Sequence, residues 1–274
     1  MAGIPAVNLT DTNPGMSVAD LRQQLEPELT TTDRKLLFLL FLRHDCDNVV
    51  RLLKHPSATI IYDGNYDAEQ YEELFADAQS IDLGTSSYPQ FLLDFIRAYA
   101  QNAERKDWFA EDEMLLRYYE YCIAESHDDF VRSWFQLNLD VTNILTALIA
   151  RQQGWKISEY VKGSNEVAEM ICTNDARDFN LGTVRDFMPE IMKIVDEKDP
   201  VEKERKLDAF KWLWLDEQTF ADTFSIEAVF AYLCKLEIQE RWAQLDAEQG
   251  RATFEQIIND LRSEAQVPAE FIKK

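Results

Sequence analysis

The spacing of apolar residues along the chain predicts a fold built from helices. From Trp134 to Trp155, apolar side chains recur at three- and four-residue intervals, which is the spacing of one core-facing helical stripe. Similar spacing recurs in most other segments, separated by short polar breaks. We therefore predict an all-α fold, an irregular array of many helices. The stripe of the Trp134 helix consists of Trp134, Leu137, Val141, Leu145 and Leu148.

Asn143 falls nearly opposite this stripe, beside Ala147 and Ala150. A polar residue between small ones indicates a second packed face, on which the amide can hydrogen-bond a neighbouring backbone. We therefore expect this helix to be covered on two sides, with Asn143 as a structural amide.

Capping residues and prolines predict where several helices begin and end. Ser17 is the expected N-cap of one helix. A threonine and aspartate cluster at residues 30–33 is expected to cap a second helix, which runs to about Lys54. The pair His55-Pro56 should end that helix, because the residue before a proline avoids the helical conformation.

In the second half of the chain, Asp199-Pro200 and Gly250 are predicted to mark helix starts. Ser225 is a further predicted N-cap, although it lacks the acid three residues later that completes a capping box. These limits predict a series of shorter helices after the Trp134 helix.

Residues 57–89 are the least regular part of the chain. Within them "ATIIYDG" is expected as a short strand or an extended link, "DAEQYEELFADAQ" as a helix and "LGTSSYP" as a loop. We predict three parts: an N-terminal helical segment at residues 1–56, an irregular link or insertion at residues 57–89, and a main helical body at residues 90–274. Together they are expected to form one continuous domain.

The strongly negative net charge of the chain limits the kinds of macromolecule that it can bind. The chain has 274 residues and a formal net charge of −22, from 50 acidic and 28 basic side chains. Such a surface repels phosphate backbones and anionic lipid headgroups, so we expect no nucleic-acid partner. The longest apolar run, Leu36 to Leu42, is far shorter than the roughly 20 residues that span a bilayer, so we expect no direct membrane insertion. The charge instead favours partners with basic protein surfaces.

Four cysteines lie far apart in helical patterns and form no C-x-x-C pair. We expect them to be reduced and buried as small apolar residues, as in a cytoplasmic protein. The N-terminus has no basic segment followed by an apolar one, so no secretory signal is expected.

Familiar catalytic and cofactor motifs are absent from the sequence. It contains no G-x-G-x-x-G, no G-x-x-x-x-G-K-[ST], no G-x-S-x-G and no E-x-x-H, so we expect no cofactor. Two dipeptides, His44-Asp45 and His127-Asp128, could supply metal ligands to an all-α phosphohydrolase. In the alternative interpretation Asp128 and Asp129 begin or cap a helix, and His44 and Asp45 lie on a solvated face.

Tryptophans are concentrated in strongly helical stretches. Trp212 and Trp214 in "FKWLWLDE" and Trp242 in "QERWAQLD" are expected to pack in the core. The alternative is that one ring of this group anchors a partner, because tryptophan carries a large share of interface energy.

Four segments carry a resemblance to a known family: "FLRHDCDNVVRLLK", "WFQLNLDVTNILTALIARQQGW", "LDAFKWLWLDE" and "FSIEAVFAYLCKLEIQERWAQLDAEQGRATFEQII". From about Met16 to Leu261 the chain resembles a bacterial family related to the central-stalk socket protein of V-type (A/V-type) ATPases, which is designated C, or d in the eukaryotic enzymes. The residues that carry the resemblance are Asp45, Asn48, Trp134, Phe135, Asn143, Asp208, Trp212, Phe224, Tyr232, Arg241, Trp242, Asp246 and Gly250.

The resemblance implies a function without catalysis. Members of that family are all-helical, funnel-like proteins on the cytoplasmic face of the ion-carrying rotor ring, where they hold the foot of the central stalk and pass torque between stalk and ring. It implies partners in the central stalk and the membrane rotor ring, and a cytoplasmic location peripheral to the inner membrane. It also makes Asp45, Asn48, Trp134, Asn143, Trp212, Arg241 and Trp242 the candidate structural or interface residues. The alternatives are the metal-dependent phosphohydrolase and a generic acidic helical adaptor.

Overall fold

The computed structural model describes residues 5, 7–9, 15–60, 63–80, 86–102, 109–221 and 224–264, with side chains described as far as residue 245. Within these residues all regular structure is helical, so the predicted all-α class is confirmed. The α-helices are α1 (Val18–Leu25), α2 (Thr31–Lys54), α3 (Ala68–Gln79), α4 (Gln90–Asn102), α5 (Ala110–Glu125), α6 (Asp129–Gln153), α7 (Glu166–Thr173), α8 (Met188–Val195), α9 (Pro200–Thr219) and α10 (Ile226–Glu264). Two short 3-10 helices, η1 (Ile157–Glu159) and η2 (Leu181–Thr183), lie between α6 and α8.

The chain divides into two compact units. The first combines Met1–Pro27 with Lys211–Lys274, and the second is Glu28–Phe210. The segment 57–89, predicted as a link or insertion, lies wholly within the second unit. One helix, α9, contains the boundary between the two units.

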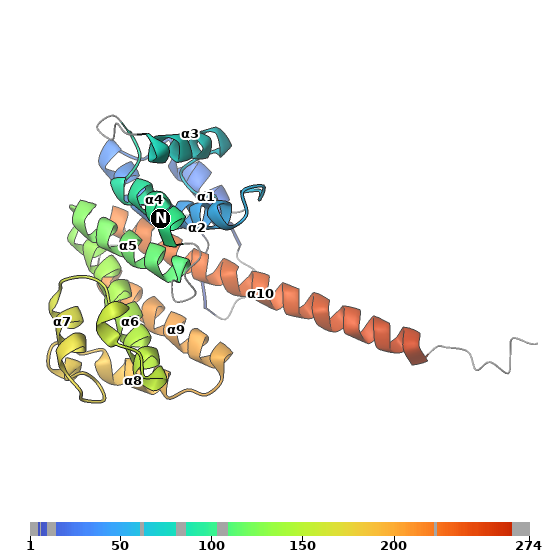
Figure 1. The fold of residues 1–274 in the computed structure, drawn as a ribbon. Coiled ribbons are helices and arrows are strands. Elements are labelled where there is room, and N and C mark those ends of the chain that lie inside the picture. The colour runs from blue at the N-terminus through green and yellow to red at the C-terminus, as the bar shows by residue number, and fades with distance from the viewer. Residues whose placement is uncertain are drawn as a thin grey trace, which may run out of the picture. The chain divides into compact units, whose positions relative to one another are not determined.

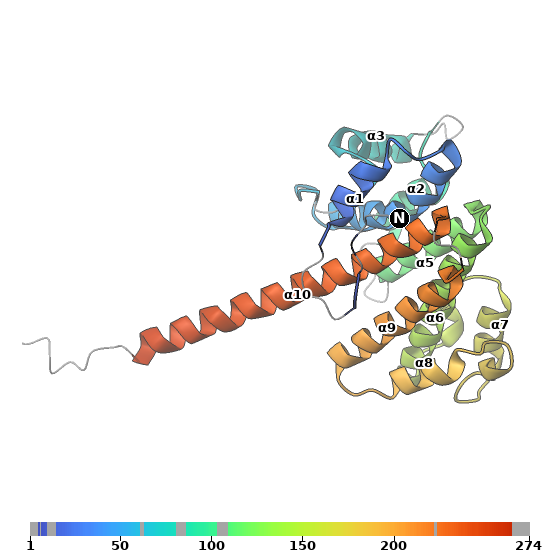
Figure 2. The ribbon, with the colours of Figure 1, turned by 180° about the vertical axis from the view of Figure 1, so that it is seen from behind.

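In the second unit, α5 packs against α2, α4 and α6. It packs along α6 on one side and α2 on another, and α3 packs against α4 (Figure 1). The helix α7 then packs against α6, as Figure 2 shows from behind. These contacts put α2, α5 and α6 at the centre of the unit's core.

The predicted caps fix the limits of the early helices. Ser17 Oγ accepts a hydrogen bond from the backbone N–H of Asp20 at the start of α1. Thr30 and Asp33 form a reciprocal capping box at the start of α2. That helix ends at Lys54, with His55 as its C-cap, as predicted. Local capping chemistry was therefore a reliable guide to these limits.

The helix α6 is covered on two sides, as predicted from the sequence. Trp134, Leu137 and Val141 of the apolar stripe are buried, with 8% of the Trp134 surface exposed. On the other side Asn143 and Ala147 are fully buried. Gly154 ends the helix in the left-handed conformation, with φ at 70°, which is accessible to glycine without strain.

The first unit is dominated by α10, a single helix of 39 residues (Figure 1). Ser225 is its N-cap, with Oγ accepting from the backbone N–H of Ala228, as predicted. The predicted helix start at Gly250 is wrong, because α10 continues through this residue. A glycine inside a helix costs only about 1 kcal/mol, and no proline follows before residue 264 to break the backbone hydrogen bonds.

Three of the four cysteines are buried and all four are free thiols. Burial raises the pKa of the thiols of Cys46, Cys122 and Cys234 well above the usual range. The expectation of burial is wrong for Cys172, which is exposed near the end of the short helix α7. Among the described helices, none combines the length and hydropathy needed to cross a membrane.

Candidate interaction site

Asp45 of α2 is a completely buried carboxylate that holds the turn before α3. Its two oxygens accept hydrogen bonds from the backbone N–H of Asn65 at 2.9 Å, and Oδ1 accepts from the Tyr66 N–H at 3.2 Å. The side-chain amide of Asn65 and the hydroxyl of Tyr71 donate to it at 2.8 and 2.7 Å. Asn48, also buried, donates to the Tyr71 hydroxyl at 3.1 Å. These side chains form one continuous hydrogen-bond chain.

The expectation that Asp45 lies on a solvated face is therefore wrong. Its donors come from a turn about twenty residues later, which closes over the carboxylate. Gly64 makes this closure possible, because a Cβ added there would lie 2.0 Å from Oδ1 of Asp45. Burial raises the pKa of Asp45, while the hydrogen bonds from the turn oppose that rise.

A second set of buried polar residues on α6 holds the loop that follows it. Asn143 donates from Nδ2 to the carbonyl of Lys162 at 2.7 Å and accepts from the N–H of Lys162 at 3.0 Å, as expected of a structural amide. Asp140, 1% exposed, accepts from Asn165 at 2.7 Å and from the Arg185 guanidinium at 3.0 Å. One face of α6 therefore fixes two separate loop segments.

Arg151, near the C-terminal end of α6, continues this arrangement. Its guanidinium carbon lies 4.0 Å from the centroid of the Phe179 ring. The same group donates to the carbonyls of Ala176 at 2.8 Å and Asn174 at 3.3 Å. The loop around Phe179 is thus tied to the helix by stacking and by hydrogen bonds.

In the first unit, the predicted core positions of Trp212 and Trp242 are confirmed. Both rings are buried in a cluster with Ile238. Val7 and Leu9 pack against the same cluster, so a segment near the N-terminus covers it. These two tryptophans stabilise the unit and do not present their rings to solvent. Trp214, which was also predicted to pack in the core, is only half-buried.

Two other residues that carry the resemblance make contacts within this unit. Arg241 is exposed and places its guanidinium carbon 5.5 Å from the centroid of Trp242. Tyr232 donates its hydroxyl to the carbonyl of Pro5 at 2.8 Å. Phe224, by contrast, is 84% exposed just before α10. Asp246 and Gly250 lie in α10 beyond the described side chains.

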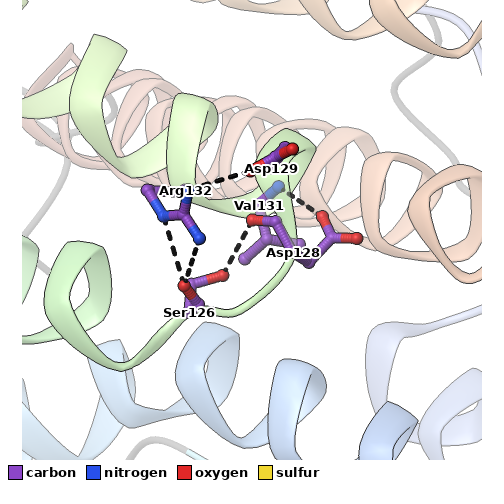
Figure 3. A network of polar contacts seen from close by, with 5 residues as sticks. All are labelled: Ser126, Asp128, Asp129, Val131 and Arg132. Carbon is purple, nitrogen blue, oxygen red and sulfur yellow. Dashed lines mark hydrogen bonds and ion pairs between the residues drawn. The ribbon is translucent and has the colours of Figure 1, made fainter.

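The His127-Asp128 dipeptide begins α6, which confirms the capping interpretation (Figure 3). The Asp128 carboxylate accepts from the N–H of Val131 at 2.8 Å. Asp129 pairs with Arg132 at 2.8 Å, and Arg132 also donates to the Ser126 carbonyl. Both aspartates of this motif are thus committed to the first turn of the helix.

The other dipeptide places its two side chains in different surroundings. His44 stacks on Phe41 of the same helix, with centroids 6.4 Å apart, whereas Asp45 is bound to the turn before α3. In the part of the chain that the structure describes, no three His, Cys, Asp or Glu side chains are grouped as metal ligands.

Three aromatic rings of the second unit form a stack at its surface. The Trp155 centroid lies 6.3 Å from that of Phe109 and 5.3 Å from that of Tyr160, each pair inclined by 26°. Phe109 is 46% exposed and Trp155 is 43% exposed. We call these three residues the aromatic stack. The sequence pattern placed Trp155 only at the end of the predicted Trp134 helix, without its ring partners.

A pocket of about 360 Å³ opens beside residues of α4 and α5 in the same unit. Its wall contains the ring pair Phe91 and Tyr121, with centroids 4.8 Å apart. Its charged residues are of both signs. The pocket is lined by Phe91, Asp94, Glu113, Arg117, Glu120, Tyr121 and Lys162.

Glu113 connects the two cations of the pocket. Its carboxylate accepts from the Arg117 Nε at 3.0 Å and pairs with the Lys162 Nζ at 3.0 Å. Burial acts to raise the pKa of Glu113, but the hydrogen bonds from Lys162 and Arg117 outweigh burial and lower it. Glu113 is therefore held as a carboxylate between two positive charges.

Comparison of the sequence with models of known families finds one family that covers nearly the whole chain. Residues 1–265 match the family model described as "Protein of unknown function (DUF2764)". The chain belongs to the DUF2764 family. No curated protein and no solved structure matches it. In this DUF2764 protein, the candidate residues Asp45, Asn48, Trp134, Asn143, Trp212 and Trp242 are all buried, and only Arg241 of the set is exposed.

Proposed function

We propose that this DUF2764 protein is a non-catalytic subunit of a V-type ATPase or ATP synthase that couples the central stalk to the membrane rotor ring. The observation that carries the proposal is the position of the residues behind the sequence resemblance. Asp45 and Asn143 each join a helix to a separate loop through several hydrogen bonds. Motif residues in such positions maintain a shape, which is what a torque-coupling protein needs.

The mechanical requirement supports the same proposal. A protein that passes torque must resist deformation, and a loop held by several directed contacts resists it better than one held by a single contact. Asp140 and Asn143 on the central part of α6 and Arg151 near its end together hold the segments around residues 162–165 and 174–185. The helix and its loops would move as one body.

Charge supports a location against basic protein surfaces. With a net charge of −22, the chain would meet basic loops of the stalk or the ring at the cytoplasmic face, peripheral to the inner membrane. Such an interface weakens with salt, because mobile ions screen charges on opposing surfaces.

Co-purification tests the proposal. The full chain is expressed with the stalk proteins and the rotor ring of a V-type ATPase from the same source, and complexes are isolated over a salt series. We expect a stoichiometric complex that dissociates as salt rises. The absence of any complex at low salt, or a complex that salt does not weaken, would contradict the proposal.

A pair of variants separates interface from scaffold in this assay. Phe224→Ala removes a ring that is 84% exposed, and Leu213→Ala removes an apolar side chain that is 61% exposed on α9. If either side chain lies in the interface, its loss weakens the complex while the thermal unfolding midpoint of the isolated chain stays unchanged. Asn143→Ala is the control for a scaffold residue, because its main effect should be a lower thermal unfolding midpoint of the isolated chain.

A further inference from the structure

We propose that the aromatic stack and the adjoining pocket form a docking site for a basic, arginine-containing segment of a partner protein. The inference stands independently of the rotary-ATPase proposal, because it rests on contacts within the second unit alone. The proposed ligand is a basic peptide segment, and no sequence motif of this chain had indicated a binding site for one.

The ion pair in the pocket wall lies close along the chain to two rings of the aromatic stack. Phe109 and Glu113 are four residues apart at the start of α5, so they lie on the same side of the helix. Tyr160 and Lys162 belong to one short loop after α6. Lys162 and Glu113, both in the pocket wall, pair at 3.0 Å and join this loop to α5. A single extended segment can therefore contact both features.

Acidic side chains outnumber basic ones at this site. Glu113 balances one of the two positive charges of Lys162 and Arg117, and with Asp94 and Glu120 also in the lining the pocket has a net charge of −1. Among the described residues, Asp112 and Glu120 form no ion pair, and both are exposed. Glu120 lines the pocket next to the rings of Phe91 and Tyr121, and Asp112 follows Phe109 by one turn. A cation entering here meets carboxylates that it alone would neutralise.

The exposed rings select the kind of cation. Burying Trp155 and Phe109 on binding would remove apolar surface from water, a gain of about 25 cal/mol for each Å². Trp155 stacks on both Phe109 and Tyr160, so the ring face offered to a ligand is that of Phe109, which is 46% exposed. An aromatic face attracts a cation, and a planar guanidinium stacks on it more effectively than an ammonium does. Arginine meets both demands of the site. Nucleic acids and anionic membranes are disfavoured by the net charge of −22.

Fluorescence anisotropy with labelled peptides tests the inference on the full chain. The peptides alternate arginine with glycine or, as the charge-reversed control, glutamate with glycine. We expect the arginine peptide alone to bind at low salt. Trp155→Ala removes the ring that supports Phe109 and should weaken this binding about fivefold, and Glu120→Gln should weaken it about threefold, as expected for losing an exposed cation–π contact or ion pair.

Two matched variants control for the general acidity of the chain. Phe220→Ala removes a ring that is 90% exposed in the first unit, and Glu169→Gln removes an exposed carboxylate of α7. Both should leave the affinity unchanged. Absence of binding at low salt, or binding that Trp155→Ala and Glu120→Gln weaken no more than the controls do, would overturn the inference. A dimer in sedimentation that Trp155→Ala dissociates would assign the site to a second copy of the chain, and would overturn it too.

Discussion

The loop after α6 contacts two very different environments. Its inner side, at Lys162 and Asn165, is bound by Asn143 and Asp140 through hydrogen bonds of 2.7 to 3.0 Å. Its outer side carries Tyr160 of the aromatic stack, at the surface of the unit. The polar groups inside are satisfied within the chain, whereas the rings outside leave apolar surface in water. The difference teaches that the residues most visible as motifs maintain the shape, and that the surface available to a partner is carried by others.

The largest expected effect comes from removing the buried carboxylate of the inner side. Asp140→Ala leaves the Arg185 guanidinium, 28% exposed, without its partner at 3.0 Å. We expect the free energy of unfolding to fall by about 3 kcal/mol, which is the usual cost of removing one partner of a buried ion pair. Urea denaturation measures it. Asp186→Ala, which removes an exposed carboxylate next to Arg185, is the control and should change little; equal losses for the two would refute the structural role of Asp140.

A smaller loss is expected for the amide on the same face. Asn143→Ala removes both hydrogen bonds to the backbone of Lys162 and leaves its part-buried N–H and C=O without these partners. The expected loss of unfolding free energy is about 2 kcal/mol. Gln152→Ala, at an exposed position of the same helix, should cost much less in the same denaturation experiment. A loss no greater than that of Gln152→Ala would show that these bonds do not hold the loop.

The outer side should respond in the opposite way. Trp155→Ala removes a ring that is 43% exposed, so less than about 1 kcal/mol of unfolding free energy should be lost. The same variant should still impair binding of the arginine peptide. A loss of stability as large as that of Asn143→Ala would place Trp155 among the scaffold residues and remove the contrast between the two sides.

The smallest expected effect is the pH dependence of stability that the ion pair between Glu113 and Lys162 produces. Because the folded state lowers the pKa of Glu113, its contribution to stability is present above the ordinary value of 4.5 and is lost as pH falls below it. Glu113→Gln cannot ionise and lacks this contribution. The difference in unfolding free energy between wild type and variant should therefore shrink as pH is lowered through 4.5. A difference that stays constant with pH would contradict the assigned pKa direction.

Local signals predicted much of the helical fold. Ser17, Thr30 and Ser225 cap helices through contacts made within three residues, and such short-range chemistry is visible in a sequence. The prediction of a helix start at Gly250 failed because glycine occurs at helix boundaries and is also tolerated inside helices, and only the surrounding backbone decides between the two.

Long-range pairing could not be predicted in the same way. Asp45 looks like a surface residue of an amphipathic helix until the turn at Asn65 and Tyr66 closes over it. The aromatic stack likewise unites Phe109 with Trp155, which no periodic pattern connects. In both cases the partners are set by how α2, α5 and α6 pack, and helical spacing carries no information about that packing.

The most direct test of the proposed coupling role compares two activities of one membrane preparation. ATP hydrolysis and ion transport are measured for the V-type ATPase of the same source, assembled with and without this protein. The account predicts that omitting the protein leaves ATP hydrolysis but abolishes ion transport, and that adding it back restores transport. Full ion transport in its absence would contradict the account.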